Sequence, residues 1–225
     1  SVGLYPNLAY NPATDFEPIG FAAGTPILIL GRKGLPPNDH KEFLAYAKAN
    51  DSKLNMAHAG IGSVSHATGT LLNSVIGIHP VAIPFNGTGP AMNALIGSQV
   101  DYLCDQIVNV VPQVQAGTIK AFAIATTDRN PAIPNVPTTK EAGLPQYEVS
   151  AWNAIFAPKG TPKPVVDKLF GAVAAALGRT DQREALAKQM MSVELSRSPT
   201  DFTEQVRKET QDWGEFLRAA RIKID

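Results

Sequence analysis

Short apolar runs alternate with segments of helical spacing along the first half of the chain. The run Ile27–Leu30 is too short for a helix and contains β-branched residues, so it predicts a buried strand. A helix is expected over residues 38–49, where Phe43 and Ala47 lie four positions apart. Alternation of this kind continues as far as Thr126. It predicts an α/β fold with a mostly parallel sheet and helices on both faces.

The second half of the chain has a different pattern. Prolines between Asp128 and Pro145 exclude a regular helix and indicate an extended connector. A strand is predicted over Tyr147–Phe156, followed by helices that would form a layer on a sheet. The expected landmarks of these helices are Thr161 as the cap of the first, with Pro162 in its first turn, Asp181 to about Met191 for the second, and Ser198 as the cap of the third.

A strand, a glycine-containing loop and a helix follow one another from Val81 onward. The apolar run ends at Pro84, Gly87 and Gly89 flank Thr88, and Pro90 is expected to open the helix. Glycines let the backbone approach a ligand closely, and the free N–H groups at a helix start favour a carboxylate or phosphate. An ordinary strand-to-helix turn, capped by Thr or Gly, is the alternative that this pattern alone leaves open.

An earlier loop has the same build. Gly60 and Gly62 interrupt a predicted strand, and Ser63 or Ser65 could cap the helix that follows. Because loops at the carboxyl ends of parallel strands lie on one side of a sheet, both helix starts could face one small anion. The candidate ligand-binding residues are therefore Gly60, Gly62, Ser63, His66, Asn86, Gly87, Thr88, Gly89 and Asp105.

Composition narrows the classes of function. The 225 residues are 44% apolar, with 20 basic and 20 acidic side chains, so no general attraction to nucleic acid is expected. Any anion must therefore be attracted locally. Cys104 is the only cysteine, which excludes an internal disulfide and favours a buried strand residue over a nucleophile. Three histidines, at positions 40, 58 and 79, lack paired ligand spacing, so neither a metal nor another cofactor is expected.

Targeting signals are not evident in the sequence. No stretch has the length of a transmembrane helix, and the first four residues have neither the basic start nor the apolar run of a signal peptide. We therefore expect either a cytoplasmic protein or a numbering that begins after processing or truncation.

Two enzymatic alternatives can be weighed from the residues. Ser63, His66 and Asp105 include the side chains needed for acyl transfer, but no Gly-x-Ser-x-Gly elbow is present. Gly60-x-Gly62 could begin a dinucleotide fingerprint, although Ser65 stands where the third glycine should be. Asp105 is expected at the carboxyl end of a strand over Val100–Cys104, where it either orients a ligand group or water or caps the next helix.

Ordered landmarks over nearly the whole chain resemble the Bug-type periplasmic solute-binding proteins of tripartite tricarboxylate transporters. No single landmark is specific, and the resemblance rests on their order along the chain. They are Asp15–Ile19, Ala59–Ser63 with His66, Pro84–Ala91, Gly97–Asp101, Arg129 with Pro134–Thr138, Glu141–Gly143, Trp152 and Ala157–Pro162.

The resemblance implies a type II periplasmic-binding-protein clamshell that closes on a small carboxylate through backbone amides, hydroxyls and water. Residues 25–146 would form the lobe with the glycine loops, and residues 1–24 with 147–225 would form the other lobe and the C-terminal helices. It further implies a periplasmic, non-catalytic protein that delivers a carboxylate, an amino acid or a related organic anion to membrane transporter subunits. We expect such a protein to act as a monomer.

Two departures from the family pattern affect these expectations. Phe85 and Asn86 stand where the family usually has Tyr and a basic residue, which removes a hydroxyl and a positive charge. Nothing at the start of the sequence matches the family's leading strand and Gly-Gly loop, so the first lobe is expected to lack its N-terminal segment. The alternatives to a solute-binding protein are an α/β enzyme acting on a nucleotide or small anion and the ligand-sensing domain of a regulator.

Overall fold

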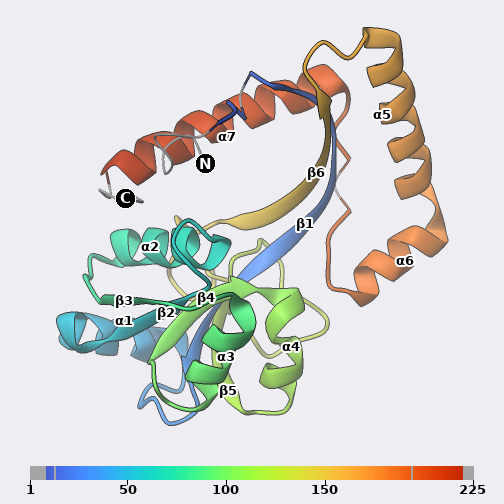
Figure 1. The fold of residues 1–225 in the computed structure, drawn as a ribbon. Helices are drawn as coiled ribbons and strands as arrows, with labels where there is room; N and C mark the ends of the chain where they lie inside the picture. Colours follow the sequence, from blue (N-terminus) through green and yellow to red (C-terminus); the bar gives the residue numbers. More distant parts are fainter. Residues whose placement is uncertain (1–8, 13, 194, 220–225) are drawn as a thin grey trace. The chain divides into compact units, whose positions relative to one another are not determined.

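The computed structural model describes residues 9–12, 14–193 and 195–219, and its elements follow the predicted alternation (Figure 1). In chain order they are β1 (Phe16–Arg32), α1 (His40–Ala49), a short 3-10 helix (Asp51–Lys53), β2 (Asn55–His58), α2 (Val64–Ile76), β3 (Val81–Pro84), α3 (Thr88–Ile96), β4 (Tyr102–Gln106), α4 (Ile107–Gln115), β5 (Ile119–Ile124), β6 (Ser150–Pro158), α5 (Lys163–Gly178), α6 (Thr180–Lys188) and α7 (Pro199–Ala219).

The chain divides into two compact units. Unit 1 comprises Ser1–Gly24 and Trp152–Asp225, and unit 2 comprises Thr25–Ala151. Two strands, β1 and β6, contribute residues to both units. The expected boundary between residues 146 and 147 falls inside unit 2, because Tyr147 is fully buried there and its hydroxyl donates to the Thr68 carbonyl at 3.0 Å.

In the unit 2 sheet β2, β3, β4 and β5 run in one direction and β1 runs against them, so the mostly parallel sheet that the alternation predicted is confirmed except for β1. The strand order is β3-β2-β4-β1-β5, in which β2 is parallel to β3 and β4, whereas β1 is antiparallel to β4 and β5. The reason is that β1 begins in unit 1 and enters this sheet from the end at which the parallel strands finish. Its run Ile27–Leu30 is 0% exposed, as expected for a central strand.

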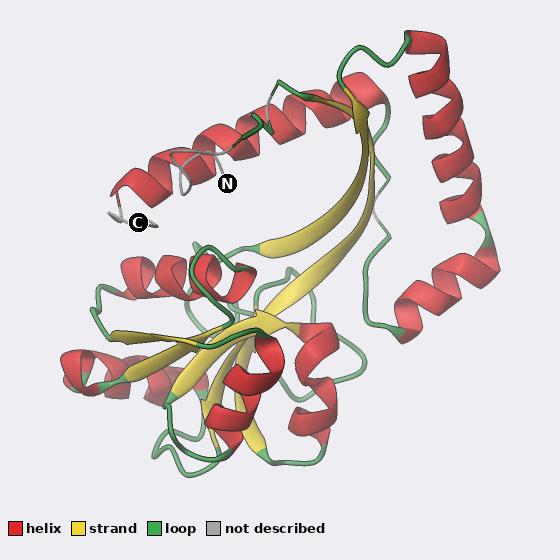
Figure 2. Cartoon of the chain, viewed as in Figure 1, coloured by secondary structure: helices red, strands yellow, loops and turns green. Residues whose placement is uncertain are grey.

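Helices cover both faces of this sheet, with α1 and α2 on one face and α3 and α4 on the other (Figure 2). On the first face, the Phe43 ring of α1 stacks on Phe122 with a centroid separation of 4.6 Å. Helix α2 lies close to β2 because residue 69 is glycine: a Cβ there would be 2.5 Å from Met56 Sδ. This close approach sets the position of the α2 N-terminus at the end of β2.

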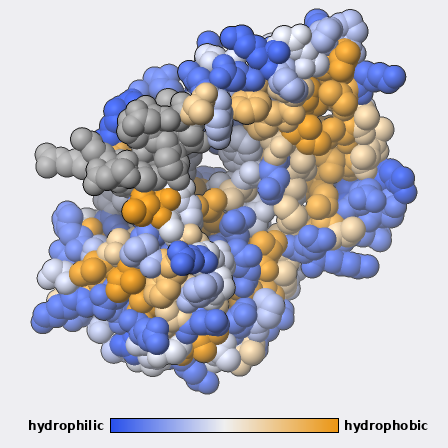
Figure 3. Space-filling model, viewed as in Figure 1, coloured by the Kyte–Doolittle hydropathy of each residue, from blue (hydrophilic) through white to orange (hydrophobic). Residues whose placement is uncertain are grey.

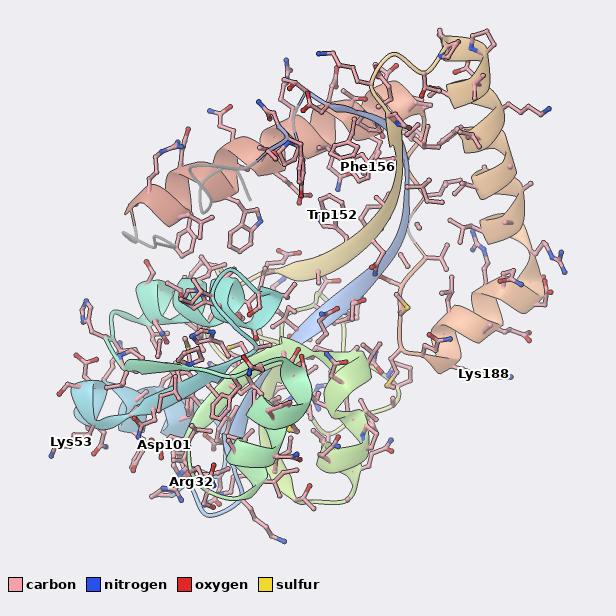
Figure 4. All side chains as sticks on the ribbon, in the orientation of Figure 1. Arg32, Lys53, Asp101, Trp152, Phe156 and Lys188 are labelled. Carbon is pink, nitrogen blue, oxygen red and sulfur yellow. The ribbon has the colours of Figure 1, made fainter. Side chains whose placement is uncertain are left out.

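The opposite end of the strands is tied together by Asp101. Its carboxylate accepts from Arg32 Nε at 3.0 Å and from the Asn55 amide at 2.9 Å, and Figure 4 shows Arg32 and Asp101 side by side. Because these partners lie on β1 and at the start of β2, one side chain links the ends of two strands. The far end of the sheet is therefore held independently of the glycine loops.

Unit 1 pairs β6 with β1 and adds α5, α6 and α7. One small core cluster consists of Ile19, Ala157 and Val166, and an aromatic group forms where Phe202 meets Phe21, Trp152 and Phe156 at centroid distances of 5.6–6.5 Å. Figure 3 shows hydrophobic residues gathered over β6 and α5, where the large exposed side chains are Ile155, Phe156, Val165 and Leu169.

The helix boundaries of unit 1 correct two predictions. Thr161 does not cap α5: Pro162 occupies the N-cap position, and the Thr161 hydroxyl donates to the Pro158 carbonyl instead. Helix α6 ends at Lys188, before the expected Met191. The predicted cap of α7 is confirmed, because the Asp201 amide donates to Ser198 Oγ at 3.0 Å.

Candidate functional site

Strands β3, β2 and β4 are parallel and end side by side, at what we call the carboxyl edge of unit 2, where β5 also ends. The loop after β2 holds Gly60 and Gly62, and β3 is followed by Gly87 in the next loop and Gly89 in the first turn of α3. Between them, the Phe85 amide donates to the His58 carbonyl at 2.9 Å. A Cβ built on Gly60 would lie 3.7 Å from the Phe85 carbonyl oxygen. The sheet therefore brings the two glycine loops into contact, as the sequence predicted.

The first loop is fixed by hydrogen bonds to side chains of its own helix. Ser63 is the N-cap of α2, and its Oγ accepts from the His66 amide at 3.2 Å. Ser65 Oγ accepts from the Ala59 amide at 2.8 Å. Gly60 and Gly62 have φ angles of 110° and 77°, in the region that favours glycine. The choice left open between Ser63 and Ser65 is thus resolved: Ser63 caps the helix and Ser65 secures the loop.

The second loop begins its helix earlier than predicted. Gly87, with φ 104°, is the N-cap of α3 and makes no side-chain cap bond, so the helix starts at Thr88 rather than at Pro90. The reason is that glycine tolerates this backbone conformation and proline is accommodated within a first turn. Amides in the first turn have no acceptor inside the helix, which makes those of Thr88 and Gly89 available to an anion. Asn86 is exposed beside them.

Asp105 lies within β4 rather than after it, and it is only 1% exposed. Its Oδ1 accepts from the Gln106 amide at 2.7 Å and from Asn109 Nδ2 at 3.1 Å. Burial raises the pKa of this carboxyl, whereas contacts with Gln106, Asn109 and Thr88 oppose the rise. Oδ2 has no donor in strict hydrogen-bonding geometry, but the Thr88 side chain is near enough to lower the pKa of the carboxyl. Asp105 therefore lies on the buried side of the Thr88 hydroxyl, in the sheet.

A pair of histidines lies at the base of the first loop. His58 ends β2 and His66 belongs to the first turn of α2, and their rings stack with centroids 4.2 Å apart. Burial, followed by the neighbouring His58 ring, lowers the pKa of His66 to about 4. Burial likewise lowers the pKa of His58. Sequence reasoning missed His58, whose only signal was its place at a strand end before Gly60.

Three buried polar atoms without a hydrogen-bond partner lie near the carboxyl edge. They are Thr25 Oγ1, His58 Nδ1 and Asp105 Oδ2. Thr25 lies at the same edge as the other two residues. It precedes Ile27 in β1 by two positions, and Ile27 pairs with Gln106, the last residue of β4. Buried polar atoms are normally satisfied, so their concentration at one edge indicates a place adapted to additional polar groups. Sequence reasoning gave no signal for Thr25.

The side chains of an acyl-transfer enzyme are not assembled. Ser63 Oγ meets the His66 amide and Ser65 Oγ, while His66 Nδ1 accepts from the Gly62 amide at 3.1 Å. Asp105 contacts Asn109 on α4, on the face of the sheet opposite α2. Cys104 is buried, and burial raises the pKa of its thiol to about 12. Within the described residues, no group of His, Cys, Asp and Glu could hold a metal ion.

A second feature of unit 2 is a surface pocket of about 600 Å³ after β5. Its lining is polar, but Arg129 Nε already contacts both carboxylate oxygens of Glu141 at 2.9–3.1 Å. The opposite charges satisfy each other there, so the pocket offers an anion less than the glycine loops do. The lining residues are Thr127, Asp128, Arg129, Thr138, Lys140 and Glu141.

Among the helices in the described part of the chain, none combines the length and apolarity needed to cross a membrane.

Comparisons with known proteins agree with this fold. Residues 3–221 match the tripartite tricarboxylate transporter family receptor, TctC. A relative from Agrobacterium vitis, described as a UPF0065 protein in the TAR-I ttuE-ttuC' intergenic region, is 42% identical over 174 residues. That alignment covers 77% of this chain and 50% of the relative, so the chain spans about half the length of this curated protein.

Solved structures of similar sequence share the fold. MatC from Rhodopseudomonas palustris with bound malate is 45% identical with a TM-score of 0.82, over 95% of this chain and 74% of that chain. The periplasmic binding protein BugD is 40% identical with a TM-score of 0.85, over 99% and 75%. An R. palustris protein with adipate is 30% identical with a TM-score of 0.87, over 98% and 74%.

These matches confirm the resemblance drawn from the sequence and the periplasmic-binding-protein type of fold. They extend across both units rather than over the glycine loops alone. The chain belongs to the family of tripartite tricarboxylate transporter receptors, TctC.

Proposed function

We propose that this protein is a solute-binding receptor that captures a small carboxylate, or a related organic anion, for a tripartite transporter. The observation that carries the proposal is the contact between two glycine loops, each leading into a helix N-terminus, at one edge of the unit 2 sheet. Helix starts favour anions through their free amides and the helix dipole. They can attract a carboxylate without a lysine or arginine.

Each candidate residue has a distinct role in this proposal. Backbone amides and hydroxyls contact the carboxylate, Asn86 offers an amide group at the exposed side, and Asp105 acts on Thr88 from behind. The binding set is Gly60, Gly62, Ser63 and His66 from the first loop, Asn86, Gly87, Thr88 and Gly89 from the second, and Asp105 from β4.

The ligand class follows from the family together with the site. MatC was solved with malate, and another similar structure was solved with adipate, both of which carry two carboxylates. We extend this class to the present chain, with one carboxylate at the glycine loops. Asn86 supplies hydrogen bonds but no positive charge, so we expect selection by geometry more than by the number of charges.

Location and partners complete the proposal. BugD, to which the chain is similar, is a periplasmic binding protein. We propose the same compartment for this chain, with membrane subunits of the transporter as its protein partners and a monomer as the binding form.

A thermal-shift screen of malate, adipate, other mono- and dicarboxylates and amino acids tests the function. A ligand present at a hundred times its dissociation constant stabilises the folded protein by about 2.7 kcal/mol. We expect at least one carboxylate to raise the melting temperature, whereas amide analogues without a carboxylate should not. A screen in which no anion stabilises the protein would contradict the proposal.

Whether a stabilising carboxylate is converted distinguishes an enzyme from a receptor. Mass spectrometry after prolonged incubation should recover a stabilising carboxylate unchanged, because Ser63, His66 and Asp105 are not placed for proton relay. Turnover of that compound would favour an α/β enzyme over a receptor.

A further inference from the structure

The turn between Gly60 and Gly62 is held at one end by a histidine side chain, because the Gly62 amide donates to His66 Nδ1 at 3.1 Å. At the other end, the His58 ring lies near the Gly60 backbone, which partly offsets the lowering of the His58 pKa by burial. The two rings are stacked, with an interplanar angle of 26°. The pair therefore connects the end of β2, the glycine turn and the first turn of α2.

This arrangement requires an uncharged His66 ring. His66 Nδ1 accepts a hydrogen bond, so its proton must lie on Nε2, and a second proton would replace the acceptor with a donor. A charged His66 would also stand in the first turn of α2, where the helix dipole disfavours a cation. If His58 became charged as well, two cations would be stacked with centroids only 4.2 Å apart.

Among the described residues, no acidic side chain shifts the pKa of His58 or His66. On β4, Cys104 is the residue that continues the β2–β4 register opposite His58, and its thiol pKa is raised by burial. Asp105 lies on the other face of the sheet, where it contacts Asn109 of α4. Tyr147 packs near Cys104 and its pKa is also raised by burial, so it is neutral. The only titratable side chain that shifts the pKa of His66 is His58.

We propose that His66 is a positioning residue, which holds the Gly62 end of the Gly60–Gly62 turn in its ligand-binding shape only while its ring is neutral. The inference rests on the proposed function for its effect on binding, but the state of the turn can be measured without any ligand. Acidification would release the Gly62 amide and loosen the first loop. The second loop contains no histidine and would keep its shape.

The first test is nuclear magnetic resonance on the ligand-free protein. Imidazole ¹⁵N spectra should show His66 protonated on Nε2 and unprotonated on Nδ1 at neutral pH. Protonation of Nδ1 should have its midpoint at about pH 4. The Gly62 amide signal should move with the same midpoint. In His66→Gln, whose side-chain oxygen can accept from Gly62 but does not titrate, that movement should disappear. The proposal would be overturned by a proton on Nδ1 at neutral pH. It would also be overturned by a Gly62 signal that does not change when His66 is protonated or replaced.

The second test measures malate affinity by calorimetry in wild type, His66→Gln and the control His79→Gln. Comparing variants at one pH cancels the protonation of malate itself. Relative to His66→Gln, wild type and the control should lose about fourfold affinity near pH 3.5, as one proton with a pKa of about 4 requires. His79 serves as the control because its side chain is 87% exposed.

The two tests fail separately. Equal pH dependence in wild type and His66→Gln would overturn the positioning role of His66. Absence of malate binding in all variants, with the expected Gly62 and His66 signals, would instead contradict the proposed ligand class and leave the positioning role of His66 intact.

Discussion

At the scale of single residues, Thr88 connects the exposed loop to the buried sheet. It is the first residue of α3, and its hydroxyl acts on the Asp105 carboxyl behind it. A hydroxyl can donate to one oxygen while accepting from another group. Thr88 is therefore the side chain through which a change at Asp105 would reach the ligand.

Thr88→Val removes this hydroxyl while keeping the shape of the side chain. We expect carboxylate affinity to fall by about 1.5 to 3 kcal/mol, the range for one hydrogen bond to a charged group. Calorimetry with a ligand from the screen measures the change. Thr118→Val, just before the start of β5 at the opposite edge of the sheet, is the matched control. Equal affinities in the three proteins would show that Thr88 makes no contact with the ligand.

Lys120 supports unit 2 away from the site. Its ammonium donates to the Leu35 and Pro37 carbonyls at 2.7 and 2.6 Å and to Asn38 Oδ1 at 3.1 Å. Lys120→Met leaves these acceptors without their donor, so we expect the free energy of unfolding to fall by about 1 to 3 kcal/mol. Urea denaturation checks this, with the exposed Lys140→Met as the control. If Lys120→Met lost no more free energy of unfolding than Lys140→Met, Lys120 would not stabilise unit 2.

Single residues also show which contacts could be predicted from the sequence and which could not. Spacing alone reduced the candidate caps of α2 to Ser63 and Ser65, because capping is a local interaction between neighbours in the chain, and the structure shows that Ser63 is the cap. The stacked His58 and His66 lie on different elements, and they meet only because Gly69 lets α2 approach β2. Contacts of this kind depend on tertiary packing, which no pattern along the chain reveals.

At the scale of elements, alternation of strands and helices predicted which segments fold but not the direction of β1. Strand β1 is antiparallel to β4 and β5 because it enters the sheet from unit 1. The sequence does not indicate this direction, because the run Ile27–Leu30 is equally apolar in either direction. The start of α3 was missed for a local reason. Pro90 is a strong helix-start signal, but Gly87 could supply the cap and let the helix begin at Thr88.

Helix α2 offers a direct test of its cap. Ser63→Ala removes the acceptor of the His66 amide, and we expect the free energy of unfolding to fall by about 1 kcal/mol. Ser74→Ala, at an exposed position in the same helix, should cause no loss, because alanine is the better helix former. Thermal denaturation of both variants makes the comparison. A Ser63→Ala protein as stable as Ser74→Ala would mean that the hydroxyl does not stabilise the helix.

At the scale of the whole molecule, the two units differ in the completeness of their cores. Unit 2 buries both faces of its central strand, whereas unit 1 leaves large apolar side chains of β6 and α5 exposed (Figure 3). Less apolar burial means less stabilisation per residue ordered. We therefore expect unit 1 to unfold at lower denaturant concentration than unit 2.

Both tryptophans of the chain lie in unit 1, at positions 152 and 213. Tryptophan fluorescence therefore reports on unit 1 alone, while far-ultraviolet circular dichroism reports on both units. In a urea titration the fluorescence midpoint should precede the dichroism midpoint, because two units of unequal stability do not unfold in one step. Coincident midpoints would show that the chain unfolds as a single cooperative unit.

The central claim is that the glycine loops at the carboxyl edge of unit 2 bind the ligand. The most direct measurement is the change in backbone amide signals when malate, or the best carboxylate of the screen, is added to ¹⁵N-labelled protein. We predict that the largest changes in unit 2 fall on Gly60–Ser63 and Asn86–Gly89. Changes centred instead on the pocket between Thr127 and Glu141, or none at saturating ligand, would contradict it.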